Sequence, residues 1–269
     1  MKLNVFQVDA FTRSAFGGNP AAVVPLEAWL ADETMQSIAL ENNLSETAFF
    51  VRVDDGYELR WFTPTFEIDL CGHATLATAF VIFTILGSEE KVLNFETKSG
   101  LLTVEKVGER LVLDFPSRPA TTCEVPAGLI DAIGKEPKEI LRSRDYLLVY
   151  ETEADILAIE PNFAELLKIN THAVIVTAQG DSSDFVSRFF APEVGVFEDP
   201  VTGSAHCTLI PYWAEKLGKT EMFARQVSAR GGELFCELKG DRVKIGGNAT
   251  LYLKGEIYIE TASQSVAAV

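Results

Sequence analysis

One segment of this chain occurs twice at a nearly constant spacing. The two copies are residues 60–74, RWFTPTFEIDLCGHA, and residues 188–205, RFFAPEVGVFEDPVTGSA. Each copy passes from an apolar run through a loop to a glycine, Gly72 or Gly203, and then into a second apolar stretch. Residues 99–110 recur in the same way as residues 231–242. The chain must therefore contain two versions of one folding unit, and a site lies between them if the two glycine turns face each other.

The composition narrows the classes of function. Of the 269 residues, 47% are hydrophobic, which is enough to bury a core in each of two units. The net charge of −16 argues against nucleic acid or an anionic membrane as a partner bound through a general basic field. A small anionic substrate stays compatible with this charge, because local backbone dipoles can hold it.

The cysteines and histidines predict neither a disulfide framework nor a structural metal site. The four cysteines include no CxxC pair, and none of the three histidines is spaced from them as a zinc ligand would be. Reduced thiols favour a cytoplasmic protein. The N-terminus shows no signal-peptide pattern, and the longest apolar stretch, residues 74–86, contains three threonines and is too short to cross a bilayer. We therefore expect no membrane association.

Strand-like segments outnumber helix-like ones, and each half has one long apolar helix. Asp32 is the expected N-cap of a further, amphipathic helix over residues 32–43. This pattern predicts an α+β fold of two pseudo-repeated domains, each a curved, mostly antiparallel sheet around a central helix. The proline-rich stretch after Phe115 places the domains at residues 1–117 and 118–249, with strands near 250–261 crossing back to complete the first. The expected strands are 5–8, 21–24, 48–53, 57–62, 92–96, 101–106 and 111–115, then 146–150, 173–177, 226–229, 234–238 and 243–245, and a final pair 250–253 and 256–259, with the central helices over 73–86 and 204–217.

Gly72 and Gly203 each open a predicted central helix. The first backbone N–H groups of a helix lack partners, and together with the helix dipole they form a ready site for an anion. Two such helix starts that converge would hold a carboxylate or a developing enolate-type oxygen. The alternative is that the glycines only let the buried helices pack closely.

Several polar side chains near these helix starts are candidates for proton chemistry. His73 lies in the first turn, where the helix dipole should lower its pKa and favour the neutral ring, unless it is only a capping or core histidine. Asp199 precedes the second helix start, as Asp69 precedes the first. The carboxylate of Asp199 could hold the His73 ring in one tautomer. Helix capping is the alternative role for Asp199 and for Ser204. Glu46 stands where a loop enters a buried strand, and a carboxylate with little water around it suits general acid/base catalysis, although a solvated loop residue is equally compatible.

The motifs in their order along the chain resemble the phenazine-biosynthesis isomerase-like (PhzF-like) family. The resemblance extends to about Gly247 and implies a fold of the diaminopimelate-epimerase type, with the site in the interdomain cleft, and a homodimer. It also implies that Glu46 is the catalytic acid/base, that His73, Asp199 and Ser204 are the other catalytic polar residues, and that Asn19 binds substrate together with Gly72, His73, Gly203 and Ser204. The matching segments are residues 4–12, 16–23, 45–50, 60–64, 69–77 and 198–205.

Related racemases on this fold use two cysteines, one before each helix-opening glycine. Here Cys71 occupies the first of these positions, but its counterpart is Thr202, and Cys207 comes five residues too late. A symmetric two-thiol racemase is therefore disfavoured, and Cys71 is expected to be a packing residue.

We expect a cofactor-independent isomerase, without metal or nucleotide, that moves a proton between carbons of a small carboxylate-bearing substrate in a biosynthetic process. Neither a phosphate loop nor a dinucleotide fingerprint is present in the sequence. An amino-acid racemase or epimerase, and a non-catalytic binder of small carboxylates, are the alternatives.

Overall fold

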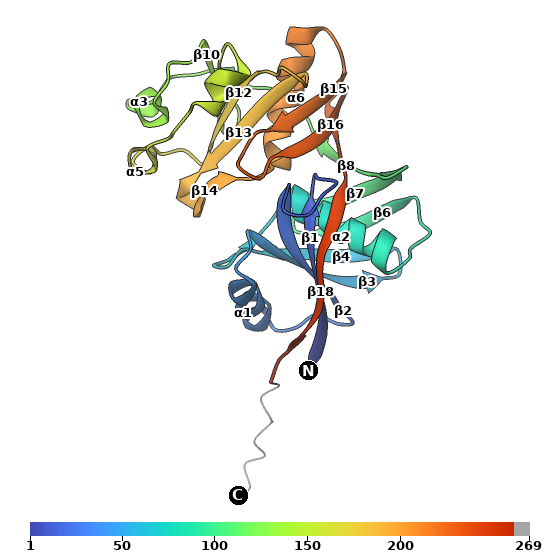
Figure 1. Cartoon of the computed structure of the whole chain (residues 1–269). Coiled ribbons are helices and arrows are strands. Elements are labelled where there is room, and N and C mark those ends of the chain that lie inside the picture. The colour runs from blue at the N-terminus through green and yellow to red at the C-terminus, as the bar shows by residue number, and fades with distance from the viewer. Residues whose placement is uncertain (261–269) are drawn as a thin grey trace, which may run out of the picture.

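The computed structural model describes residues 1–260, which form two stacked lobes (Figure 1). The N-terminal lobe contains a buried helix surrounded by strands, and a second helix on its outside. Its elements are β1 (Lys2–Ala10), β2 (Asn19–Leu26), α1 (Asp32–Asn42), β3 (Glu46–Val53), β4 (Gly56–Phe62), β5 (Glu67–Ile68), α2 (Gly72–Phe80), the π-helical turn η1 (Val81–Ile85), β6 (Val92–Thr97), β7 (Gly100–Val107) and β8 (Arg110–Pro116).

The second lobe follows the same order of main strands and central helix. Its elements are β9 (Thr121–Thr122), α3 (Leu129–Ile133), β10 (Glu139–Arg142), β11 (Tyr146–Val149), α4 (Glu153–Leu157), α5 (Phe163–Leu166), β12 (Val174–Gln179), β13 (Phe185–Ala191), the 3-10 turn η2 (Pro192–Val194), β14 (Val196–Asp199), α6 (Gly203–Leu217), β15 (Glu221–Gln226), β16 (Gly232–Lys239) and β17 (Arg242–Gly247). In this lobe β9, α3 and η2 are added to the order, and two short helices, α4 and α5, stand in place of α1. The last strand, β18 (Ala249–Tyr258), returns to the first lobe.

Strand pairing confirms that the two lobes share one topology. In the first lobe, β1–β2 is antiparallel, β2–β3 parallel, β3–β4 antiparallel and β4–β6 parallel. In the second, β10–β11, β11–β12, β12–β13 and β13–β15 follow the same sequence of directions. The predicted fold class is therefore correct, and equivalent positions in the two lobes can be assigned from the strand register.

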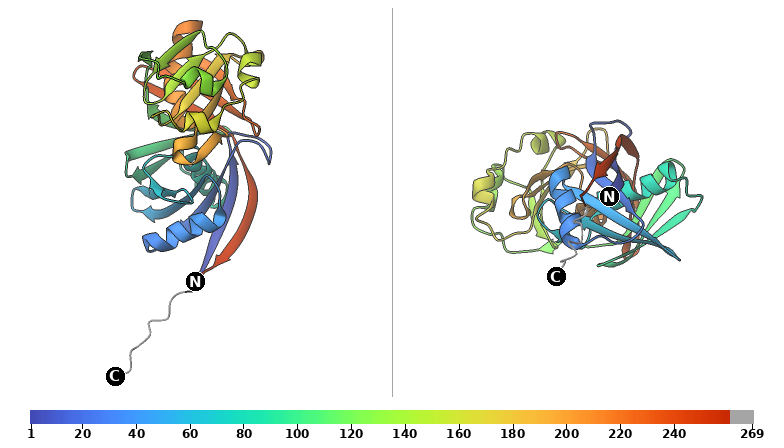
Figure 2. Two further views of the ribbon diagram at one scale, coloured as in Figure 1. Left: turned by 90° about the vertical axis from the view of Figure 1, so that its left-hand side faces the viewer. Right: turned by 90° about the horizontal axis from the view of Figure 1, so that it is seen from below.

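Two sheet contacts join the lobes. β8 pairs antiparallel with β17, with Phe115 opposite Val243, and β18 pairs antiparallel with β1 along the length of that strand. The expected pair of C-terminal strands is thus a single strand, and residue 261, the end of that expectation, lies outside the described residues. In the side and end views of Figure 2, β18 lies along β1 on the outside of the first lobe.

The central helices are buried because their sequences are almost wholly apolar or small. Seven of the nine residues of α2 are buried, and the helix axis is surrounded by its own sheet. The helix expected over residues 73–86 divides at Phe80, after which the chain continues as η1. Within residues 1–260, no helix is both long and apolar enough to cross a membrane.

Two local predictions were wrong: the cap at Asp32, and the strand over residues 226–229, which the structure places at Glu221–Gln226 (β15). Asp32 is the first residue of α1 and does not cap it; Ala31 occupies the cap position, and the Asp32 carboxylate lies 2.9 Å from Nη1 of Arg60. The short helices α4 and α5 of the second lobe were also not predicted from the sequence; their caps, Thr152 and Asn162, each accept a hydrogen bond from the backbone. Helices of four or five residues leave no detectable hydrophobic periodicity.

Candidate active site

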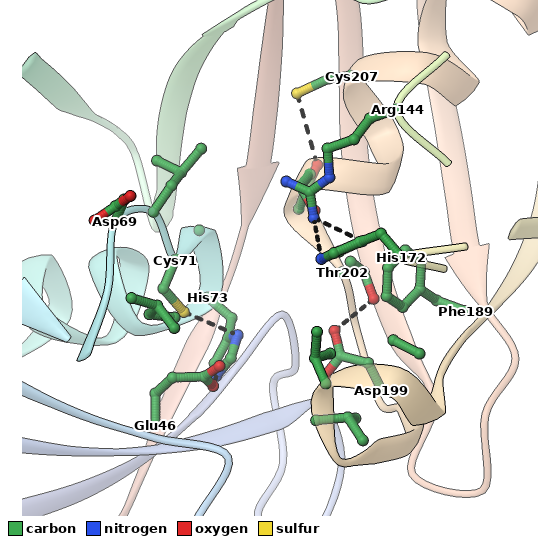
Figure 3. Close-up of a pocket in the computed structure, with 18 of the residues that line it drawn as sticks. Glu46, Asp69, Cys71, His73, Arg144, His172, Phe189, Asp199, Thr202 and Cys207 are labelled. Carbon is green, nitrogen blue, oxygen red and sulfur yellow. Dashed lines mark hydrogen bonds and ion pairs between the residues drawn. The ribbon is translucent and has the colours of Figure 1, made fainter. Parts of the chain in front are cut away.

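A cavity of about 410 Å³ lies where the starts of α2 and α6 meet (Figure 3). A Cβ atom placed on Gly72 or on Gly203 would lie 3.5 Å from the Cα atom of the other, so the two helix starts touch through their glycines. The residues before them, Cys71 and Thr202, have extended backbones, and neither side chain caps its helix. The first N–H groups of both helices thus remain available to an anion in the cavity.

Glu46 and His73 meet at one side of this cavity. Glu46 is the first residue of β3, opposite Ala21 of the parallel strand β2, and its Oε2 lies 3.0 Å from Nε2 of His73. The side chains are only 13% and 6% exposed. The two atoms are within ion-pair distance but are not aligned as a hydrogen bond, so both retain bonding capacity toward a ligand.

Asn19 connects His73 to the second lobe. Its Nδ2 donates to Oδ1 of Asp199 at 2.7 Å and to the carbonyl of Val201 at 2.9 Å, and it lies 3.2 Å from Nδ1 of His73. The expectation that Asp199 itself orients the His73 ring is therefore replaced by an indirect arrangement, because the amide of Asn19 stands between them. Asn19 is fully buried, and its Oδ1 has no hydrogen-bond partner among residues 1–260.

Asp199 is held by the residues around the second helix start. Its Oδ2 accepts a hydrogen bond from the hydroxyl of Thr202 at 2.5 Å, and Gln226 donates to its backbone carbonyl at 2.8 Å. Burial of the carboxyl group raises the pKa of Asp199 to about 6, although the charge of His73 and the bonds from Thr202 and Asn19 act in the opposite direction. Asp199 can therefore exchange a proton near neutral pH.

The charge state predicted for His73 was wrong. Burial lowers the pKa of His73, but the Cys71 sulfur and the Glu46 carboxylate beside it both favour the protonated ring, and the pKa is raised well above its ordinary value. These two close groups outweigh the helix dipole, which acts at a longer distance and as a partial charge. Burial also raises the pKa of the Cys71 thiol, whose sulfur lies 3.5 Å from Nδ1 of His73.

Ser204 and Asp69, the remaining candidates, differ in their positions relative to the cavity. Ser204 lines the cavity in the first turn of α6. Asp69 is exposed at the rim of the cavity, and in Figure 3 its carboxylate points away from Glu46 and His73.

The register of the repeated strands shows where the two lobes differ. Arg60 pairs with Glu67 and Arg188 with Glu198, each through two hydrogen bonds, so these arginines are structurally equivalent. Arg60 lies opposite Phe49, three residues after Glu46, and Arg188 lies opposite Val176, three residues after Ala173. Ala173 thus occupies the position in the second lobe that Glu46 occupies in the first, and the acid has no symmetry-related partner.

Sequence reasoning missed the far wall of the cavity. Arg118, Arg144 and His172 line it together with the aromatic rings of Phe66, Phe115 and Phe189. Arg144 and His172 are 28 residues apart and meet because β11 and β12, which they precede, are parallel neighbours. Neither lies in a motif, so pattern alone could not have identified them.

Among residues 1–260, Glu46, Cys71 and His73 are the group best placed to hold a metal ion, since one ligand atom from each lies within 4.8 Å of the others. However, Cys71 approaches Nδ1 of the ring and Glu46 approaches Nε2. A single ion cannot use both nitrogens of one imidazole, so this arrangement fits proton exchange better than metal binding.

Comparison with known proteins places the chain in a family. Residues 8–255 match the family described as phenazine biosynthesis-like protein. A Pseudomonas aeruginosa protein named an uncharacterized isomerase is 53% identical over 259 residues, covering 96% of this chain and all of that protein. A human phenazine biosynthesis-like domain-containing protein is 42% identical, covering 96% of this chain and 99% of its own length.

Solved structures agree with this assignment. The crystal structure of a PhzF-family protein from Enterococcus faecalis superimposes with a TM-score of 0.94 at 50% identity, covering 96% of this chain and all of that one. A hydroxyproline epimerase from Agrobacterium vitis shares the fold at a TM-score of 0.60 and 10% identity, over 95% and 92% of the two chains. The chain therefore belongs to the phenazine biosynthesis-like (PhzF-like) family and is an isomerase.

Proposed function

We propose that the protein moves a proton between carbons of a small carboxylate-bearing substrate, with Glu46 as the general acid/base. The observation that carries the proposal is the one-sided placement of the acid: Glu46 lies in the cavity beside His73, while its equivalent in the second lobe is Ala173. A two-base racemase requires an acid or thiol on each side of the reacting carbon. An isomerase in which a single base removes a proton and returns it to another carbon requires an acid on one side only.

The paired helix starts supply the electrostatic part of the mechanism. A substrate carboxylate at the N–H groups after Gly72 and Gly203 would neutralise two helix dipoles at once, and charge that develops next to it during proton removal would be stabilised there. The cavity lies in the range of volumes that suits a small molecule.

His73, Asn19 and Asp199 would support the transfer. His73, whose pKa is raised, lies 3.0 Å from Glu46 and can exchange a proton with the substrate on the same side of the cavity. The amide of Asn19 lies between His73 and Asp199 and contacts both side chains. The pKa of Asp199 is about 6, so this carboxyl group can gain or lose a proton near neutral pH. Ser204, at the second helix start, would donate a hydrogen bond to the substrate.

The test is proton exchange in deuterated water. The protein is incubated with cyclic dienes and with amino acids, all bearing a carboxylate, and the position of incorporated deuterium is read by NMR. Incorporation at a carbon remote from the one that loses its proton supports the isomerase. Exchange confined to one α-carbon supports a racemase or epimerase, and binding without exchange supports a non-catalytic binder.

We also propose that the protein works as a cytoplasmic homodimer. Exposed aromatic side chains near β18 support association, since Phe16, Tyr252 and Tyr258 are each about half exposed or more on the outside of the first lobe. Analytical ultracentrifugation checks this, and a purely monomeric sedimentation coefficient at micromolar concentration would contradict it.

A further inference from the structure

A second polar cluster faces the cavity from the C-terminal lobe. Nη2 of Arg144 lies 2.8 Å from Nε2 of His172, and Nδ1 of His172 lies 2.9 Å from Oδ1 of Asp145. The carboxylate of Asp145 is buried and also lies 3.5 Å from Nε of Arg144. The buried aspartate thus holds both side chains, and in Figure 3 the guanidinium of Arg144 points into the space in front of α6.

Arg118 adds a second positive charge to this wall. Its side chain is partly buried and has no hydrogen-bond or ion-pair partner among the described residues, whereas its backbone N–H donates to the carbonyl of Cys207 at 2.8 Å. Arg118, Arg144 and Cys207 line the same cavity. Burial raises the pKa of the Cys207 thiol to about 11, and the charges of Arg118, Arg144 and Arg242 oppose that shift.

This wall is separate from the paired helix starts. Cys207 follows Gly203 by four residues on α6, a little over one turn, so the backbone of Arg118, which donates to the Cys207 carbonyl, meets the helix roughly 6 Å along from its start. Arg118 has no carboxylate partner among the described residues, and Arg144 approaches the carboxylate of Asp145 only through Nε, at 3.5 Å. Both guanidinium groups therefore keep N–H donors that an anionic ligand can use.

We propose that Arg144 and Arg118 bind a second anionic group of the substrate, a carboxylate or a phosphate. This inference rests on the proposed function for the first carboxylate, which the helix starts at Gly72 and Gly203 hold. The substrate class is then a small dianion whose two charges are separated by a short carbon skeleton. Asp145 and His172 are positioning residues that fix the direction of the Arg144 guanidinium.

The experiment compares adipate with hexanoate, which share a carbon chain and differ in the second carboxylate. Calorimetry measures both affinities, and NMR shifts of the Gly72 and Gly203 amides show that the ligand occupies the cavity. The wild-type protein should bind adipate at least about tenfold more tightly, because a guanidinium–carboxylate pair forms charge-assisted hydrogen bonds. Arg144→Gln and Arg118→Gln should each weaken this preference, and the double variant should remove it.

Arg142→Gln is the matched control. Arg142 is exposed on β10, two residues from Arg144, and packs over the ring of Tyr146 outside the cavity, so its loss changes the net charge equally and should leave the preference intact. A wild-type protein that does not favour adipate, whether it binds both probes or neither, overturns the proposal. So does a double variant that keeps the full preference.

The test is independent of catalysis. Because binding needs no proton transfer, the preference for adipate should persist in Glu46→Gln. If Glu46→Gln exchanges protons normally but the arginine variants lose the preference, the proposed general base is wrong and the anion site stands. If Glu46→Gln loses proton exchange but the arginine variants keep the preference for adipate, the anion site is wrong and the general base stands.

Discussion

Gly72 and Gly203 meet so closely that a Cβ atom on either would lie 3.5 Å from the Cα atom of the other. One methyl group at this separation makes an ordinary van der Waals contact, but two would compete for the same space. We therefore expect each single alanine variant to lower the free energy of unfolding by about 1 kcal/mol or less, and the double variant to lose at least about 1 kcal/mol more than the sum. Urea denaturation of the four proteins measures the coupling, and additive losses would show that the helix starts are farther apart than described.

Asn19 should be important for stability because it satisfies two buried acceptors across the lobes. Asn19→Ala leaves Oδ1 of Asp199 and the carbonyl of Val201 without this donor, which should lower the free energy of unfolding by about 1–3 kcal/mol. Asn94→Ala, at an exposed position of β6, is the control and should change it by less than about 0.5 kcal/mol. Equal effects of the two substitutions, measured by chemical denaturation, would contradict the bridging role.

Asp199 should make stability depend on pH in a defined direction. Its pKa is about 6 in the folded protein against 3.8 ordinarily, so the folded state holds the proton more tightly, and stability from this group falls as the pH rises between about 4 and 6. Asp199→Asn removes the ionisable group and keeps a side chain of similar shape. The variant should gain stability relative to the wild type by about 1–3 kcal/mol on going from pH 4 to pH 7.

Denaturation of the wild type and of Asp199→Asn at higher pH also tests the raised pKa of Asp199. The gain should level off above about pH 7, where Asp199 is ionised in both states. A wild-type protein that becomes more stable than the variant as the pH rises would reverse the sign and contradict the raised pKa.

Cys71 should be dispensable for proton exchange. Burial raises the pKa of its thiol, so it is neither a ready nucleophile nor a base at neutral pH. Cys71→Ala should keep the exchange rate within about tenfold of the wild type, a loss smaller than removal of a general base causes. Iodoacetamide should first modify Cys123, the one cysteine of the four that is not buried. Exchange that disappears in Cys71→Ala would indicate a thiol base.

The sequence predicted the repeat, the central helices and the residues at their starts, because each depends on local signals: a glycine before an apolar run, an acid before a buried strand. The bridge through Asn19 was beyond such reasoning, since its partner Asp199 is 180 residues away and only the closure of the two lobes brings them together. The His73 charge was misjudged because two close groups outweigh the helix dipole, Cys71 in the same segment and Glu46 from a neighbouring strand. Arg144 and His172 likewise depend on the parallel pairing of β11 with β12. Local pattern thus identified the helix starts, and long-range pairing determined what surrounds them.

The central claim is that Glu46 transfers the proton, and Glu46→Gln in deuterated water tests it most directly. The substitution keeps the shape of the side chain and removes the base, so the rate of deuterium incorporation into carbon should fall by about 10²–10⁴ while the substrate still binds. Asp69→Asn, which removes an acid at the exposed rim of the same cavity, should stay close to the wild-type rate. Incorporation by Glu46→Gln at the wild-type rate would contradict the account.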